Sequence, residues 1–273
     1  MLEQFYIDDI GNGDLSSTFL FPETATGEME IIAKMGGIFC GKKVIQSCLK
    51  VVDDSTTVYC HIEDGEQVVK GTIIATVTGS VKSLLKSERV LLNLIQRMSG
   101  IATATKEVVE RIKGTNTKVC DTRKTMPGLG MLDKYAVRAG GGFNHRQGLD
   151  DAVMLKDNHL AFAGSITKAI QKVREHLGHT VKIEVEIETF EQLKEAVDVR
   201  ADIIMFDNCT PQEIKEWRSL VPDSIVTEAS GTITKDTIYN YAVAGVDYIS
   251  LGYLTHSVKA FDMSANVSVD KSN

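Results

Sequence analysis

The fold is decided by residues 183–220, which read IEVEIETFEQLKEAVDVRADIIMFDNCTPQEIKEWRSL. One apolar run ends at Glu186, and a second apolar run ends at Asp207. Amphipathic helix patterns follow both runs. Short apolar strands that alternate with helices predict parallel strands joined by helical crossovers.

The two helix patterns carry their own start signals. Phe190–Val197 is preceded by Thr189, with Gln192 three residues later, which is a candidate capping box. Pro211–Leu220 begins with the sequence Thr-Pro-Gln-Glu, a capping box with proline in the first turn. These signals support helices between the strands.

The same unit recurs over about 150 residues, a span long enough for one α/β domain. Its apolar runs end in Asp121, Lys156, Glu186, Asp207, Glu228 and Gly252. In α/β folds the residues that follow the strands collect where ligands bind. An open sheet uses mainly its switch point, so a polar or glycine residue after every strand favours the mouth of an α/β barrel.

The first part of the chain is organised differently. It contains short strand-like runs at Met29–Met35, Thr57–Ile62 and Val68–Val77. Gly41–Val52 has apolar residues at helical spacing, and together these patterns predict a small α+β domain. A strong helix pattern at Ser87–Met98 follows. We therefore expect two domains, residues 1–90 and residues 91–273.

Composition excludes several classes of protein. The formal net charge of −7 argues against nucleic-acid binding, so any cationic site must be local. The apolar runs are far shorter than the ~20 residues of a membrane-spanning helix. The acidic start, MLEQFYIDDI, lacks the order of a signal peptide. The 5 scattered cysteines fit reduced thiols, and we expect a cytoplasmic protein.

One segment, residues 118–159, concentrates positive charge among turn-forming residues. It contains Arg123-Lys124, His145-Arg146, and Lys156 with His159, set among glycines, a proline and asparagines. A packed core rejects charge and an ordinary exposed helix avoids glycine, so this composition indicates a binding surface. The segment predicts a pocket for a polyanionic small molecule.

Several motifs occur in order along nearly the whole chain. They are GDLSS near the start, ERVLLNLIQRMSGIAT, DTRKTMPGL, KYAVRAGGGFNHRQGL, LKDNH, EVE, DN, EASG and SLGYLTHS. In these motifs the chain resembles the quinolinate phosphoribosyltransferase family. A related family linked to molybdenum transport shares the early motifs and lacks the NHR and KDNH combination.

The resemblance implies an N-terminal α+β open sandwich followed by an incomplete α/β (TIM-like) barrel. It also implies a homo-oligomer, either a dimer or a hexamer built as a trimer of dimers. In that assembly the N-terminal domain covers the site of a neighbouring subunit. The implied reaction joins quinolinate to phosphoribosyl pyrophosphate with loss of carbon dioxide, giving nicotinate mononucleotide and pyrophosphate. Neither nucleic acid nor a membrane is an expected partner.

The resemblance also implies roles for single residues. The cationic wall for the two carboxylates of quinolinate comprises Arg89, Arg123, Lys124, His145, Arg146 and Lys156, with Thr122 as a further substrate-binding residue. Arginine suits a carboxylate because its planar fork donates two hydrogen bonds. Arg89 is expected to reach the site of a neighbouring subunit.

The sugar donor is implied to meet Glu186 and Asp207, with Asp207 also near Mg²⁺, which prefers carboxylate and phosphate oxygens. Its 5′-phosphate is implied to meet the loops at Ser230-Gly231-Thr232 and Gly252-Tyr253-Leu254. The catalytic residues are expected to be Lys124, Lys156, Glu186 and Asp207.

The chain departs from the family pattern at three positions. Gly130 stands where many members have arginine, Thr232 replaces a common glycine, and Cys209 replaces methionine. None of these is a residue to which catalysis is assigned.

Two alternative functions remain open. One is a phosphoribosyltransferase for another pyridine or heterocyclic acid. The other is a non-catalytic metabolite-binding regulator. Retention of Lys156, Glu186 and Asp207 together favours an enzyme, because a sensor need not stabilise a transition state.

Overall fold

The structure, a computed structural model, describes residues 1–269. The chain divides into two compact units, the first formed by Met1–Ala104 with the residues from Val258 onward, and the second by Thr105–Ser257. The boundary expected near residue 90 lies inside helix α4 (Val81–Arg111), which runs without a break past Ala104. Within the described residues, no helix combines the length and apolarity needed to cross a membrane.

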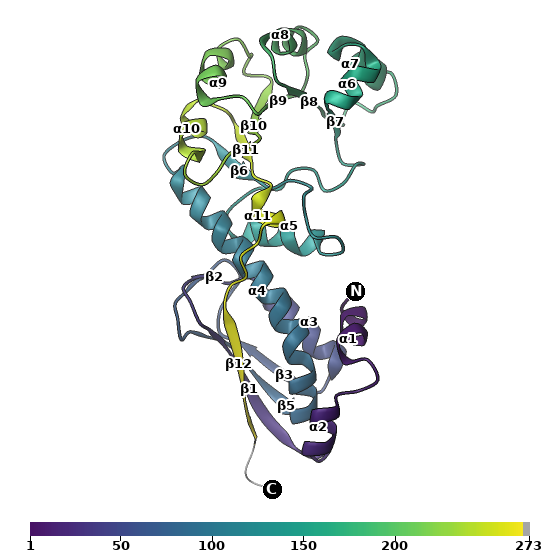
Figure 1. Cartoon of the computed structure of the whole chain (residues 1–273), viewed down its shortest axis with the longest axis vertical. Coiled ribbons are helices and arrows are strands. Elements are labelled where there is room, and N and C mark those ends of the chain that lie inside the picture. Colours follow the sequence, from purple (N-terminus) through teal and green to yellow (C-terminus); the bar gives the residue numbers. More distant parts are fainter. Residues whose placement is uncertain (270–273) are drawn as a thin grey trace. The chain divides into compact units, whose positions relative to one another are not determined.

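The first unit is built on an antiparallel sheet with strand order β12-β1-β5-β3. These strands are β1 (Thr26–Ala33), β3 (Thr57–Cys60), β5 (Ile73–Ser80) and β12 (Met263–Val269). Met29 and Ile31 of β1 are fully buried and alternate with less buried neighbours, as in a sheet with one covered face. Figure 1 shows helices α3 (Lys42–Val52) and α4 lying along this sheet.

The smaller elements of this unit are α1 (Leu2–Ile10), α2 (Leu15–Leu20), β2 (Gly37–Ile38) and β4 (Gln67–Val68). Strands β2 and β4 form a separate antiparallel pair. The run Val68–Val77, which reads as one strand in the sequence, is divided between β4 and β5 because the chain turns at Lys70-Gly71.

The C-terminal strand belongs to the first unit, whereas the sequence placed all residues after 90 in one domain. Strand β12 pairs with β1 from Ala33↔Met263 to Gly27↔Val269. Before it, the backbone N–H of the buried Phe261 donates to the carbonyl of Gln96 at 2.9 Å. The Gln96 side chain in turn donates to the carbonyl of Met263 at 2.9 Å. These long-range bonds fix the return of the chain.

The second unit contains a parallel sheet with strand order β6-β11-β10-β9-β8-β7. Its strands are β6 (Lys118–Cys120), β7 (Val153–Leu155), β8 (Ile183–Ile187), β9 (Ile203–Asp207), β10 (Val226–Ser230) and β11 (Tyr248–Ser250). Beyond β6 there is only an isolated bridge from Cys120 to Phe143, and within residues 1–269 no pairing joins β6 to β7. The expected mixed α/β fold, with an incomplete barrel in its second half, is confirmed.

The strands of this unit are connected by helices. They are α5 (Gly130–Ala139), α6 (Asp157–Ala163), α7 (Ile166–Arg174), α8 (Phe190–Asp198), α9 (Pro211–Arg218), α10 (Ile238–Val243) and the short α11 (Tyr253–His256). The capping boxes expected at Thr189 and Thr210 are both present. They are local signals, so they hold irrespective of the tertiary packing.

Candidate active site

Residues from the carboxyl ends of the parallel strands meet in one pocket of about 330 Å³. The pocket is lined by Thr122, Arg123, Lys124, His145, Arg146, Met154, Lys156, Glu186, Met205, Asp207, Ser230 and Ser250. Asp207, Ser230 and Ser250 are each the last residue of a strand, and Lys156 directly follows one. The structure thus brings together most of the residues that the sequence singles out.

The cationic side of the pocket is formed by Arg123, Lys124, Arg146 and Lys156. The Arg146 guanidinium donates to the carbonyl of Ala152 at 2.8 Å, which fixes its position. Burial, followed by the charge of Arg123, lowers the pKa of Arg146, as expected for two guanidinium groups that share one site. The pocket therefore has a concentrated positive side despite the negative net charge of the chain.

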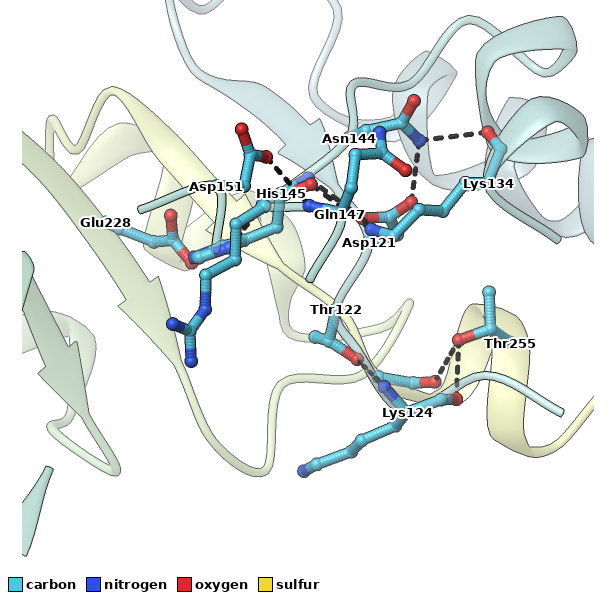
Figure 2. A network of polar contacts seen from close by, with 12 residues as sticks. Asp121, Thr122, Lys124, Lys134, Asn144, His145, Gln147, Asp151, Glu228 and Thr255 are labelled. Atoms are coloured by element: carbon cyan, nitrogen blue, oxygen red, sulfur yellow. Dashed lines mark hydrogen bonds and ion pairs between the residues drawn. The ribbon is translucent and has the colours of Figure 1, made fainter. Parts of the chain in front are cut away.

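Lys124 is positioned by hydrogen bonds to its backbone and by the close approach of its side chain to a glycine. Its N–H donates to the Thr122 hydroxyl at 3.0 Å, and its carbonyl accepts from the Thr255 hydroxyl at 2.8 Å (Figure 2). A Cβ added at Gly252 would lie 3.0 Å from Cδ of Lys124. Glycine at this position lets the lysine stem pass close to the chain.

The acidic side of the pocket is formed by Glu186 and Asp207. The ammonium group of Lys156 contacts the Glu186 carboxylate. Burial raises the pKa of Glu186 above its usual value, the Lys156 contact lowers it, and the neighbouring Asp207 raises it again. Asp207 accepts from the side chain of Asn208 at 3.1 Å and lines the pocket. Of the two carboxylates, Asp207 is the one that could hold a divalent cation, because Glu186 is already paired with an ammonium group.

His145 lines the pocket, but both of its ring nitrogens already have partners. Nδ1 accepts from the backbone N–H of Arg146 at 2.8 Å, and Nε2 lies 3.1 Å from a carboxylate oxygen of Glu184. His159 is similarly engaged, because its Nδ1 accepts from the backbone N–H of Lys156 at 3.0 Å as the cap of helix α6. These contacts orient both histidines, so the arginines and lysines that line the pocket are its main cationic groups.

A buried ion pair holds the segment that carries His145 and Arg146. Asp121 accepts from the Lys134 ammonium group at 2.7 Å, and their side chains are 0 % and 6 % exposed. The same carboxylate accepts from the His145 backbone N–H at 2.8 Å and from the Asn144 side chain at 2.7 Å (Figure 2). The sequence placed Asp121 at the mouth of the barrel, but it faces this network instead.

The expected phosphate-binding loops are only partly represented in the pocket lining. Ser230 lines the pocket, whereas Gly231, Thr232, Gly252, Tyr253 and Leu254 do not. Gly231 has φ 85°, and a Cβ there would lie 2.2 Å from the side-chain oxygen of Asn208. Thr232 has φ 52° and adopts a left-handed conformation that glycine accepts without strain. Leu254 is almost fully buried.

Arg89 belongs to the first unit and is absent from the pocket lining. Its guanidinium lies 3.7 Å from the carboxylate of Glu88 on helix α4, and its side chain is 59 % exposed. Neither observation tests its expected role toward a neighbouring subunit, which stays a prediction.

Sequence reasoning missed several residues of the site. Met154, Met205 and Ser250 line the pocket, and Glu184 contacts His145 from within the barrel. Glu228 was expected at the end of a strand, but β10 continues to Ser230 and leaves Glu228 buried. These residues could have been found from the alternation of side chains along a strand. Residues two positions apart, such as 184 and 186 or 228 and 230, lie on the same face.

Fold and pocket together are typical of an α/β enzyme with an incomplete barrel, and the cations that line the pocket suit an anionic small molecule. The chain belongs to the quinolinate phosphoribosyl transferase family. The model of the family's N-terminal domain matches residues 14–99, and the model of its C-terminal domain matches residues 101–266.

Known proteins resemble the chain over nearly its whole length. A probable nicotinate-nucleotide pyrophosphorylase [carboxylating] of Bacillus subtilis is 51% identical, over 98% of this chain and 93% of that protein. A mitochondrial quinolinate phosphoribosyltransferase [decarboxylating] of Nicotiana tabacum is 38% identical, over 96% of this chain and 80% of that protein. The crystal structure of NadC from Streptococcus pyogenes has a TM-score of 0.95 at 37% identity, covering 99% of this chain and 96% of that one.

Proposed function

We propose that this chain transfers the phosphoribosyl group of phosphoribosyl pyrophosphate to quinolinate, with release of carbon dioxide and pyrophosphate. The product is nicotinate mononucleotide, a precursor of NAD. One observation carries the proposal: a single pocket is lined by Arg123, Lys124 and Arg146 together with the carboxylates of Glu186 and Asp207. The free thiols of all 5 cysteines support a reducing compartment, and we place the enzyme in the cytoplasm.

The cationic wall matches the two adjacent carboxylates of quinolinate. A guanidinium can grip one carboxylate with two parallel hydrogen bonds, and a lysine adds a point charge. Holding both anionic substrates together and shielding their repulsion is the main task of the site. Lys124 and Lys156 are the catalytic cations in this assignment.

Glu186 and Asp207 are the residues that face the sugar. As pyrophosphate leaves, positive charge develops on the ribose ring, and nearby carboxylates stabilise it. Mg²⁺ bound with the pyrophosphate would neutralise part of its charge, and Asp207 is the carboxylate that fits it. Once the pyridine nitrogen carries the ribose, its positive charge stabilises the electron pair that remains when carbon dioxide departs. That ring carbon then takes up a proton.

The loops that follow β10 and β11 are assigned to the 5′-phosphate. Ser230 offers a hydroxyl in the pocket. The backbone N–H groups around Gly231 and Gly252, which lie outside the pocket lining, are assigned to the same phosphate. Thr122, next to the wall, is a further contact of the substrate.

The working enzyme is proposed to be a homo-oligomer, a dimer or a hexamer of three dimers, in which Arg89 completes the site of a neighbouring subunit. The exposed guanidinium of Arg89 supports this role. Mixing Arg89→Ala with Lys124→Ala subunits tests it. Sites that combine one intact Arg89 with one intact Lys124 would restore part of the activity, whereas a mixture as inactive as its components contradicts the arrangement.

Turnover tests the function itself. The purified chain is given quinolinate, phosphoribosyl pyrophosphate and Mg²⁺, with nicotinate as a parallel substrate. Nicotinate mononucleotide from quinolinate alone is the expected result. Product from nicotinate alone would favour the transferase for another acid, and binding without product from either acid would favour a regulator.

A further inference from the structure

A buried cluster of three side chains lies behind the substrate pocket. His145, Glu184 and Glu228 have side chains that are 11 %, 2 % and 6 % exposed. Nε2 of His145 lies 3.1 Å from Oε2 of Glu184 and 3.6 Å from Oε1 of Glu228. One imidazole nitrogen therefore faces two buried carboxyl groups.

The cluster also borders a second pocket, of about 340 Å³, at the opposite end of the strands. This pocket includes Ile203 and Val226, the first residues of β9 and β10. His145 lines both pockets, whereas Glu184 and Glu228 line only the second. His145 thus lies between the substrate pocket and the two carboxyl groups.

The hydrogen bonds of His145 leave Oε1 of Glu228 without a donor, and the Ser250 hydroxyl is the other donor beside this carboxyl group. Nδ1 of His145 accepts the Arg146 N–H, so the ring proton resides on Nε2. That proton can serve only one carboxylate, and Glu184 is the nearer. Among the described residues, no hydrogen-bond partner is found for the buried Oε1 of Glu228. A charged carboxylate with a buried oxygen that has no donor is unfavourable, and a proton on Glu228 removes that charge.

The surrounding charges also favour a protonated, uncharged Glu228. Burial, followed by the charge of Glu184, raises the pKa of Glu228 to about 7. Burial lowers the pKa of His145, but its contact with Glu184 and the charge of Glu228 raise it above the usual value. The other titratable and charged groups around the cluster are Cys120, Asp121, Lys134, Arg146, Asp151, Lys182, Glu186 and Tyr248. Of these, Lys134 is already paired with Asp121.

We infer that Glu228 is a positioning residue that works in its uncharged form, and that its ionisation weakens the binding of anionic substrate in the neighbouring pocket. The inference rests on the proposed function for the identity of the anion. A second negative charge behind His145 would oppose the cationic wall, and the low dielectric of a buried site strengthens that opposition. Binding of quinolinate should therefore draw a proton onto Glu228.

Calorimetry of quinolinate binding at pH 7.5, in two buffers of different ionisation enthalpy, measures that proton directly. The parent enzyme should take up a substantial fraction of one proton, and E228Q should take up close to none. Quinolinate KM in the parent should rise by at least about fivefold between pH 7 and pH 8.5, because the uncharged form becomes scarce. In E228Q it should change little over the same range. The exposed Glu191→Gln is the matched control and should behave as the parent.

E184Q provides a second variant if E228Q folds poorly. Removing the Glu184 charge lowers the pKa of Glu228, so proton uptake at pH 7.5 should shrink and move to lower pH. Equal proton uptake in the parent and E228Q, or a parent KM that is flat with pH, would overturn the inference. So would a stoichiometric divalent cation that co-purifies with the parent and is lost from E228Q. An enzyme that turns over quinolinate without this pH effect refutes only the inference, whereas no turnover at any pH refutes the proposed function.

Discussion

Replacing Lys134 with methionine tests whether the ion pair with Asp121 holds the substrate-binding segment. Both side chains are almost fully buried, and Asp121 also accepts from the His145 N–H and the Asn144 amide. Lys134→Met leaves a buried carboxylate whose cation is missing. Breaking one side of a buried pair destabilises a protein by about 3–5 kcal/mol. We expect a loss in this range, which is a large fraction of the stability of one domain.

The double variant Asp121→Asn with Lys134→Met separates charge from packing. An asparagine still offers an oxygen to the His145 N–H, and no unpaired charge remains. We expect the double variant to be more stable than Lys134→Met alone by about 1–3 kcal/mol, which is the sign of a coupled pair. Quinolinate KM should rise in Lys134→Met because Arg146 follows the released segment.

Urea unfolding followed by tryptophan fluorescence measures these changes in the relevant unit. The chain has 1 tryptophan, Trp217 on α9, with its ring centroid 5.9 Å from that of Phe190 and 6.4 Å from that of Phe206. The exposed Lys168→Met is the matched control and should be neutral. A loss of less than about 1 kcal/mol in Lys134→Met, or strict additivity in the double variant, would refute the reasoning.

Three further predictions concern the pocket. Lys124→Ala should lower kcat/KM by at least about 100-fold through the lost cation, with an unchanged urea midpoint, and near-normal turnover would contradict its role. Gly252→Ala places a Cβ 3.0 Å from the Lys124 stem, so steady-state kinetics should show about a tenfold higher quinolinate KM; an unchanged KM would contradict the close fit. Thr232→Gly relieves a left-handed φ of 52° and should raise stability by about 1 kcal/mol, whereas a lower urea midpoint would contradict strain there.

The parts of the fold that were predictable are those with local causes. Alternating apolar runs and capping boxes indicated the parallel strands and helices of the second unit, and the capping box at Thr210 is present as expected. The return of the C-terminal strand to β1 was not predictable, because its partners lie more than 200 residues away. No local pattern encodes such a pairing.

The site was predictable where a polar residue lies at or next to the carboxyl end of a strand. Lys156, Glu186 and Asp207 were found in this way and line the pocket together. The same rule failed for Asp121 and Glu228, because it locates a residue along the strand without fixing its depth in the barrel. Glu228 is buried because β10 continues for two residues beyond it. Asp121 faces its buried partner Lys134 instead of the pocket.

The most direct measurement uses quinolinate labelled in its 2-carboxylate, incubated with phosphoribosyl pyrophosphate and Mg²⁺. Labelled carbon dioxide and nicotinate mononucleotide are counted together, with nicotinate as the parallel acid. We expect equal amounts of the two products from quinolinate and no nucleotide from nicotinate. Nucleotide formed from nicotinate at a comparable rate, or nucleotide formed from quinolinate without carbon dioxide, would contradict a site built for two carboxylates.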